Sequence, residues 1–155
     1  CLILENVEKL KKDQIDLVMR KILLKASNIS GLAFSNTTTA AAHSISYPLT
    51  IHYGIPHGIA SSITLLPLLD INRNFIKDSL NRICKNLELS YNELKQTIKE
   101  IPDGVLLYTL DKWGVSKDQL IRLANESFTK GRMDNNIIDL TIDDVLIILE
   151  QVYSK

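Results

Sequence analysis

The strongest constraint on the fold is a helical spacing of apolar residues between Asp13 and Ser35. Apolar side chains recur every three or four positions with Lys and Arg between them, at Ile15, Leu17, Val18, Ile22, Leu23, Ala26, Ile29, Leu32, Ala33 and Phe34. This spacing predicts an amphipathic helix whose second half is almost wholly apolar. The sequence contains no alternating β-branched run flanked by hairpin turns, so we predict an all-α helical bundle.

Three further helix starts are predicted in the second half of the chain. Each has a hydroxyl residue followed three positions later by a residue that can complete or imitate a capping box: Ser90 with Glu93, Ser116 with Gln119, and Thr141 with Asp144. In a capping box, the first side chain accepts a hydrogen bond from the backbone N–H of the third helical residue, and that residue's side chain accepts one in return. An apolar period follows each pair, which supports the all-α prediction.

Length and composition fit one helical domain over residues 1–155. The chain has 155 residues, of which 45% are hydrophobic and 6% aromatic. A domain of this size buries roughly 70% of the surface of its unfolded chain. With so few aromatic residues, we expect a core made mostly of Leu, Ile and Ala side chains, as in packed helices.

Charge and hydropathy argue against nucleic-acid and membrane partners. Eighteen basic and eighteen acidic residues cancel, and no long Lys or Arg cluster supplies the basic patch of a nucleic-acid binder. The longest apolar run, Ile59 to Leu69, is too short to cross a bilayer and contains hydroxyl residues. We therefore predict a cytoplasmic protein, in which Cys1 and Cys84 are free thiols and Cys84 packs on an apolar helix face.

Two histidines fourteen positions apart are the candidate metal ligands. His43 lies in an Ala-rich helical run, and His57 follows a Gly54–Pro56 turn and opens another apolar helix that we expect to reach about Leu69. A neutral imidazole donates a lone pair to a metal, but a stable site needs three or four ligands. His43 and His57 therefore predict part of a metal site.

The helix around His43 is bounded by a capping segment and a proline. Asn36, followed by Thr37 to Thr39, offers a choice of N-cap, and Pro48 removes a backbone donor. Proline in a helix interior loses a hydrogen bond and clashes with the preceding turn. We therefore expect the helix to kink or end near Tyr47.

The run from Gly31 to Leu69 resembles the C-terminal helical domain of the iron-containing (group III) alcohol dehydrogenase family. It reads GLAFSNTTTAAAHSISYPLTIHYGIPHGIASSITLLPLL. In the family, a small apolar helix bears one metal-binding His, a Pro-Leu pair follows, and a Pro-His-Gly motif bears the last His. His43 and His57 match these positions. The tail from Gly131 to Val152 resembles the family's C-terminal end more weakly.

The resemblance implies the metal-binding half of a two-domain, NAD- or NADP-dependent enzyme that acts on a small alcohol or aldehyde. Its N-terminal nucleotide-binding domain and an Asp-x-x-x-His helix with the other metal ligands have no match in this chain, so we interpret the chain as a fragment that is inactive alone. The metal would act as a Lewis acid during hydride transfer, with Fe(II) favoured and Zn(II) able to compete. The resemblance also implies a possible homodimer.

Two pocket residues are suggested by the same resemblance, and no residue of this chain is assigned as catalytic or cofactor-binding. Many family members carry a second His four residues after the first, where this chain has Tyr47. Phe34 matches an aromatic that lines the substrate pocket in relatives, and we predict that both residues bind substrate. His52 matches no ligand position, and we expect it to have no functional role.

Two alternatives stay open. The chain could be a helical interaction or scaffold module with incidental histidines, which predicts no metal dependence. Within the enzyme class, glycerol dehydrogenases and dehydroquinate synthases share the general fold, although their histidine spacings differ. A domain without its nucleotide-binding partner would expose an apolar wall, so we also expect self-association.

Overall fold

The computed structural model describes residues 2–12 and 15–154, and every regular element among these residues is helical. The all-α prediction is thereby confirmed. The helices divide by their contacts into two compact units, one made of residues 1–38 and 81–105 and the other of residues 39–80 and 106–155. We describe each unit by itself, and the prediction of one domain over residues 1–155 stays a prediction.

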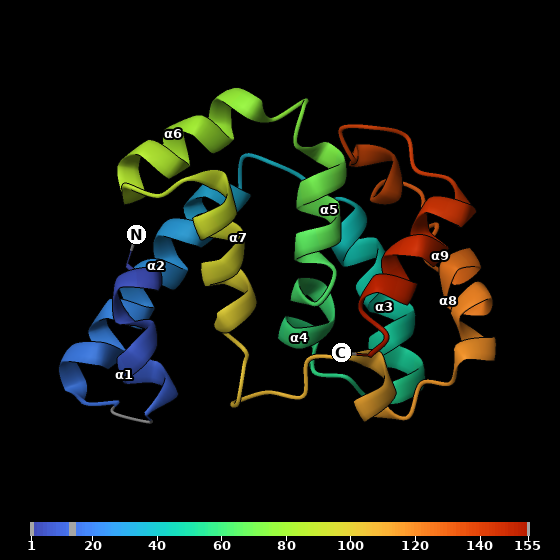
Figure 1. Cartoon of the computed structure of the whole chain (residues 1–155), viewed down its shortest axis with the longest axis horizontal. Helices are drawn as coiled ribbons and strands as arrows, with labels where there is room; N and C mark the ends of the chain where they lie inside the picture. Colours follow the sequence, from blue (N-terminus) through green and yellow to red (C-terminus); the bar gives the residue numbers. More distant parts are fainter. Residues whose placement is uncertain (1, 13–14, 155) are drawn as a thin grey trace. The chain divides into compact units, whose positions relative to one another are not determined.

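The first unit contains α1 (Val7–Lys11), α2 (Leu17–Phe34), most of α6 (Lys77–Leu87) and α7 (Tyr91–Glu100), preceded by the short 3₁₀ helix η1 (Leu4–Asn6) (Figure 1). Helix α2 begins where the side chain of Asp16 accepts a hydrogen bond of 2.7 Å from the backbone N–H of Met19. The predicted start at Asp13 lies outside the described residues. Met19 is the one buried residue of α2.

The second unit contains α3 (Ala41–Tyr53), α4 (His57–Ser62), α5 (Leu65–Asn72), α8 (Leu120–Glu126) and α9 (Ile142–Gln151). Three 3₁₀ helices, η2 (Leu110–Trp113), η3 (Lys117–Gln119) and η4 (Met133–Asn135), connect them. Helix α3 packs on α4, α5 and α8, and α9 packs on α5 and α8. One continuous apolar core results, in which Leu, Ile and Ala predominate as predicted.

Helix α3 continues through Pro48 to Tyr53, so the predicted end near Tyr47 is wrong. Ala41, Ile45 and Leu49 are spaced by four residues and are at most 1% exposed, which places them on one buried face of the helix. Packing of this face outweighs the hydrogen bond that a proline removes. The predicted cap at Asn36 to Thr39 is also wrong, because Ala40 occupies the N-cap without a side-chain hydrogen bond.

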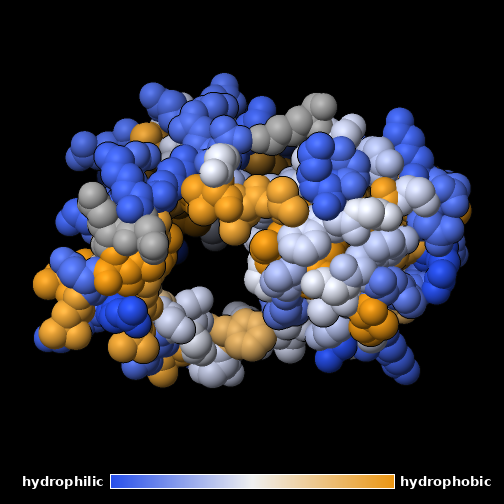
Figure 2. Space-filling model, turned by 90° about the horizontal axis from the view of Figure 1, so that it is seen from below, coloured by the Kyte–Doolittle hydropathy of each residue, from blue (hydrophilic) through white to orange (hydrophobic). Residues whose placement is uncertain are grey.

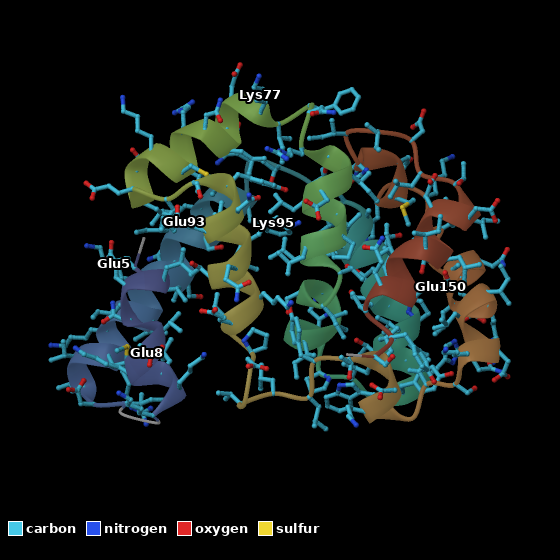
Figure 3. The ribbon with its side chains drawn as sticks, in the orientation of Figure 1. Glu5, Glu8, Lys77, Glu93, Lys95 and Glu150 are labelled. Carbon is cyan, nitrogen blue, oxygen red and sulfur yellow. The ribbon has the colours of Figure 1, made fainter. Side chains whose placement is uncertain are left out.

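The capping predictions are confirmed at two of the three helix starts. Ser90 and Glu93 form a complete capping box on α7, and Thr141 and Asp144 form another on α9. Figure 3 labels Glu93 at the first turn of α7. Ser116 precedes the 3₁₀ helix η3 and makes no capping hydrogen bond, so the third prediction gives the correct position and the wrong local structure.

Three smaller predictions have mixed outcomes. The helix that begins at His57 is interrupted by a turn at Ile63 and Thr64, so the residues up to Asn72 form two helices. Cys84 is a free thiol that is partly buried, whereas Cys1 lies outside the described residues. Among residues 2–12 and 15–154, no helix combines the length and hydropathy needed to cross a membrane.

Candidate metal and substrate site

The structure brings the His43 and His57 rings together. His43 lies in the first turn of α3, and His57 is the first residue of α4. Gly54 ends α3 in the left-handed conformation, with φ of 64°, so the chain can reverse within three residues before α4 begins. The two ring centroids are 5.4 Å apart, with 62° between the ring planes.

This separation fits two imidazoles that share one metal ion. A metal–nitrogen bond is about 2.0–2.1 Å long, so the centres of two rings on one ion lie roughly 5 Å apart at ordinary ligand angles. The observed 5.4 Å agrees with that value. Within the part of the chain that the structure describes, no group of three His, Cys, Asp or Glu side chains could hold a metal. The pair can therefore supply two ligands of a larger set.

The surroundings of His43 favour its neutral, metal-binding form. Burial lowers the pKa of this imidazole, and the charges of His57 and Arg132 lower it further. A lowered pKa keeps the ring neutral over a wider pH range, and only a neutral imidazole has a lone pair for a metal. His43 is half-buried, whereas His57 is exposed.

Tyr47 lies beside the imidazole pair, as expected for a residue one helical turn after His43. Its half-buried ring is stacked with His57, with ring centroids 6.4 Å apart and an interplanar angle of 28°. On the Tyr47 ring lies the guanidinium carbon of Arg132, 4.3 Å from the ring centroid. The site therefore contains two imidazoles, a phenol and a cation.

Arg132 was not found from the sequence. It lies 85 positions after Tyr47, at the start of the tail that resembles the family only weakly, and that resemblance gave it no role. Buried Ser44 on α3 anchors this segment: its hydroxyl donates to the backbone carbonyl of Ser127 and accepts from the backbone N–H of Thr129 at 3.3 Å. Only this long-range packing, which no local pattern encodes, places Arg132 at the site.

A second anchor follows Arg132 in the chain. The side-chain amide of Asn135, in η4, donates to the backbone carbonyl of Thr39 at 3.0 Å, and Thr39 is two residues before α3. The segment that carries Arg132 is thus attached to the α3 region on both sides. Its guanidinium is held by the fold of the second unit and not by a free loop.

The two remaining sequence candidates are His52 and Phe34. His52 contacts Glu126 on α8 through its Nε2 atom, and its lack of a functional role stays a prediction. Phe34 is the last residue of α2 in the first unit and is 50% exposed. Its predicted contact with substrate stays a prediction.

Comparisons with known proteins give one family. Residues 1–153 match the Fe-containing alcohol dehydrogenase family, C-terminal part. The chain is 38% identical over 68 residues to "Phosphonoacetaldehyde reductase" of Streptomyces viridochromogenes, covering 44% of this chain and 17% of that protein. It is 24% identical over 160 residues to "Alcohol dehydrogenase 4" of Saccharomyces cerevisiae, covering 98% of this chain and 41% of that protein.

Two other matches extend over almost the whole chain. "4-hydroxybutyrate dehydrogenase" of Clostridium kluyveri is 23% identical over 159 residues, covering 97% of this chain and 42% of that protein. The solved structure of an alcohol dehydrogenase from Oenococcus oeni has the same fold, with a TM-score of 0.79 and 19% identity over 98% of this chain and 42% of that chain. The chain thus spans about two fifths of the length of relatives that it matches from end to end.

Proposed function

The chain belongs to the Fe-containing alcohol dehydrogenase family, and from this premise we propose that it is the metal-binding part of an NAD- or NADP-dependent enzyme. Family relatives are alcohol dehydrogenases and aldehyde reductases. The proposed reaction is hydride transfer between a nicotinamide and a small alcohol or aldehyde. A nucleotide-binding domain outside this chain, a cytoplasmic setting and a homodimer are further parts of the proposal.

The observation that carries the proposal is the 5.4 Å separation of the His43 and His57 rings. In the proposed enzyme, His43 and His57 would supply two ligands to a divalent metal, Fe(II) or Zn(II), which would contribute Lewis-acid chemistry at a substrate oxygen, and the nicotinamide would contribute the redox chemistry. The role of this chain is to hold the two imidazoles close together, with the pKa of His43 lowered by burial so that this ring stays neutral. The buried face of α3 and the Gly54 turn fix their positions.

Tyr47 has a separate role in the proposal. Its ring covers one side of His57 and leaves a phenol at the position where many family members carry an imidazole. A phenolic O–H can donate a hydrogen bond to a substrate oxygen. We propose that Tyr47 orients the substrate in this way.

The substrate is proposed to be a short alcohol or aldehyde. The names of two matched relatives refer to phosphonoacetaldehyde and to 4-hydroxybutyrate, and each of these compounds carries an anionic group a few bonds from the reacting carbon. A panel of short aldehydes, assayed with NADH and with NADPH, would identify the class and the preferred cofactor.

The decisive experiment measures metal content. The complete protein that contains this chain is purified with Fe(II) or Zn(II), and the bound metal and aldehyde reduction are measured for His43→Ala, His57→Ala and the double variant. We expect each single change to weaken metal binding by more than about 100-fold, because even an outer-shell change costs 10- to 100-fold. The double variant should hold no stoichiometric metal.

His52→Ala is the matched control. It removes an imidazole from the same helix as His43, but this imidazole contacts Glu126 instead of His57. We expect the His52 variant to retain its metal and its activity. Stoichiometric metal and full activity in the double variant would show that the ligand assignment is wrong.

A further inference from the structure

Arg132 is a cation beside the imidazole pair that the proposed hydride transfer does not require. Its guanidinium carbon lies 4.3 Å from the centre of the Tyr47 ring, and the same ring is stacked with His57 at a centroid distance of 6.4 Å. A positive charge next to metal ligands opposes binding of a second cation. Its presence at this position therefore calls for a role other than holding the metal.

The hydrogen-bonding edge of Arg132 is available to a ligand. A guanidinium that lies on an aromatic ring uses its flat face for that contact, while its five N–H donors point outward in its own plane. Across residues 2–12 and 15–154, no carboxylate forms an ion pair with Arg132. The side chain is half-buried and its segment is anchored to Ser44 and Thr39, so the cation is fixed in place before any ligand binds.

We propose that Arg132 determines substrate specificity by binding a phosphonate or carboxylate group of the aldehyde substrate, an inference that rests on the function proposed above for His43 and His57. Planar guanidinium groups bind both anions through two parallel hydrogen bonds. Tyr47 contacts Arg132 on one side and His57 on the other. One aromatic ring thus separates the cation from the imidazole pair, which suits a substrate with only a few bonds between its anionic group and its carbonyl carbon.

A second possible source of the anion is the cofactor, whose phosphates could also bind an arginine. The two sources predict different kinetic changes. Loss of a substrate contact raises KM or lowers kcat/KM for anionic aldehydes and leaves uncharged aldehydes and the cofactor KM unchanged. Loss of a cofactor contact raises the cofactor KM with every aldehyde.

The test compares Arg132→Gln with wild type in the complete metal-loaded protein. Phosphonoacetaldehyde and 4-oxobutanoate serve as anionic substrates, and propanal and butanal serve as uncharged ones. We expect kcat/KM for the anionic aldehydes to fall by roughly 10- to 100-fold, as for loss of a charge-assisted hydrogen bond. For the uncharged aldehydes it should change by less than about threefold, since they make no such bond.

Two further variants separate recognition from packing. Lys130→Gln removes the same charge two positions earlier from an exposed side chain, and we expect no preferential loss for anionic aldehydes. Arg132→Lys keeps the charge but lacks the planar fork, so its loss should be intermediate and again confined to anionic substrates. If Arg132→Gln does not fold, Arg132→Lys tests the proposal instead, through the loss of kcat/KM for anionic aldehydes relative to uncharged ones.

Binding of methylphosphonate gives a readout that does not depend on turnover. We expect it to raise the melting temperature of wild type and Lys130→Gln protein, and to have no effect on Arg132→Gln. Equal stabilisation of all three, equal kinetic losses for charged and uncharged aldehydes, or a change confined to the cofactor KM would each overturn the role of Arg132. A wild-type protein that binds methylphosphonate through Arg132 but neither metal nor any aldehyde would overturn the proposed reaction and leave the anion site standing.

Discussion

The two compact units use similar helical sequences in opposite ways. In the second unit, α3 buries Ala41, Ile45 and Leu49 in a core shared with α4, α5, α8 and α9. In the first unit, α2 is also rich in apolar residues, yet Leu17, Leu24 and other apolar side chains remain largely exposed. Every residue of the described apolar core belongs to the second unit.

The difference shows that an apolar helix face indicates burial but does not identify the surface that buries it. Figure 2 shows hydrophobic surface in the part of the view where α1 and α2 lie. The residues that carry the candidate site, His43, His57, Tyr47 and Arg132, all belong to the unit that has its own core. A site whose geometry must be exact to within fractions of an ångström benefits from a rigid support.

The largest expected stability difference comes from the same substitution in each unit. Leu49 is 0% exposed in α3, and Leu24 is 71% exposed in α2. Leu49→Ala leaves a cavity in a packed core and should lower the free energy of unfolding by about 2–5 kcal/mol. Leu24→Ala should change it by less than about 0.5 kcal/mol, because exposed positions contribute little.

Urea denaturation of the two variants measures this difference, with circular dichroism as the probe. If Leu24→Ala costs as much as Leu49→Ala, the exposed face of α2 must be covered in the protein by residues outside those described. That outcome would break the contrast between the units. It would also favour one of two explanations for a covered face, the predicted self-association or a preceding domain. Light scattering of the wild-type and Leu24→Ala proteins would distinguish the two.

Local rules predicted the parts of the molecule that depend on neighbouring residues. The two complete capping boxes and the turn at Gly54 follow from spacing and residue type alone. The sequence also singled out His43 and His57, whose rings the fold brings to 5.4 Å. Their binding of a metal stays a prediction.

Long-range packing decided what the sequence could not predict. Proline at position 48 was expected to kink or end its helix; the helix does not end there but continues to Tyr53, with Ile45 and Leu49 on its buried face. Arg132 reaches Tyr47 in a segment that Ser44 and Thr39 anchor from more than eighty residues away in the chain. In both cases the deciding contacts join residues that are distant in the chain, and local propensity carries no information about them.

The next prediction compares the same capping motif in the two units. Ser90→Ala on α7 and Thr141→Ala on α9 each remove a hydroxyl that accepts a backbone N–H, which costs about 1 kcal/mol of helix stability. Helix α9 buries Val145, Ile148 and Leu149, whereas α7 buries Leu94 alone. We expect the Thr141 variant to lower global stability and the Ser90 variant to increase local opening of α7.

Hydrogen exchange of the backbone amides measures both effects, since local and global opening give different sets of accelerated amides. Substitution of the half-buried Thr97, which lies within α7 and is not its cap, by Ala is a control for composition. Equal losses of global stability in the Ser90 and Thr141 variants would mean that the two units unfold together.

The smallest effect is expected from acid, and it again concerns one carboxylate in each unit. Hydrogen bonds from Thr141 lower the pKa of Asp144, and those from Ser90 lower the pKa of Glu93. A carboxyl whose pKa is lower in the folded state stabilises that state fully above its unfolded pKa, and this contribution is lost as the pH falls through the folded value. For Asp144 the ordinary value is 3.8, so the loss occurs below about pH 4.

The melting temperature of Asp144→Asn should therefore lie below that of wild type at pH 7 and approach it at pH 3. Glu93→Gln should show the same convergence in the exchange rates of α7 amides only. A melting-temperature gap for Asp144→Asn that persists unchanged at pH 3 would show that its carboxylate charge does not support α9.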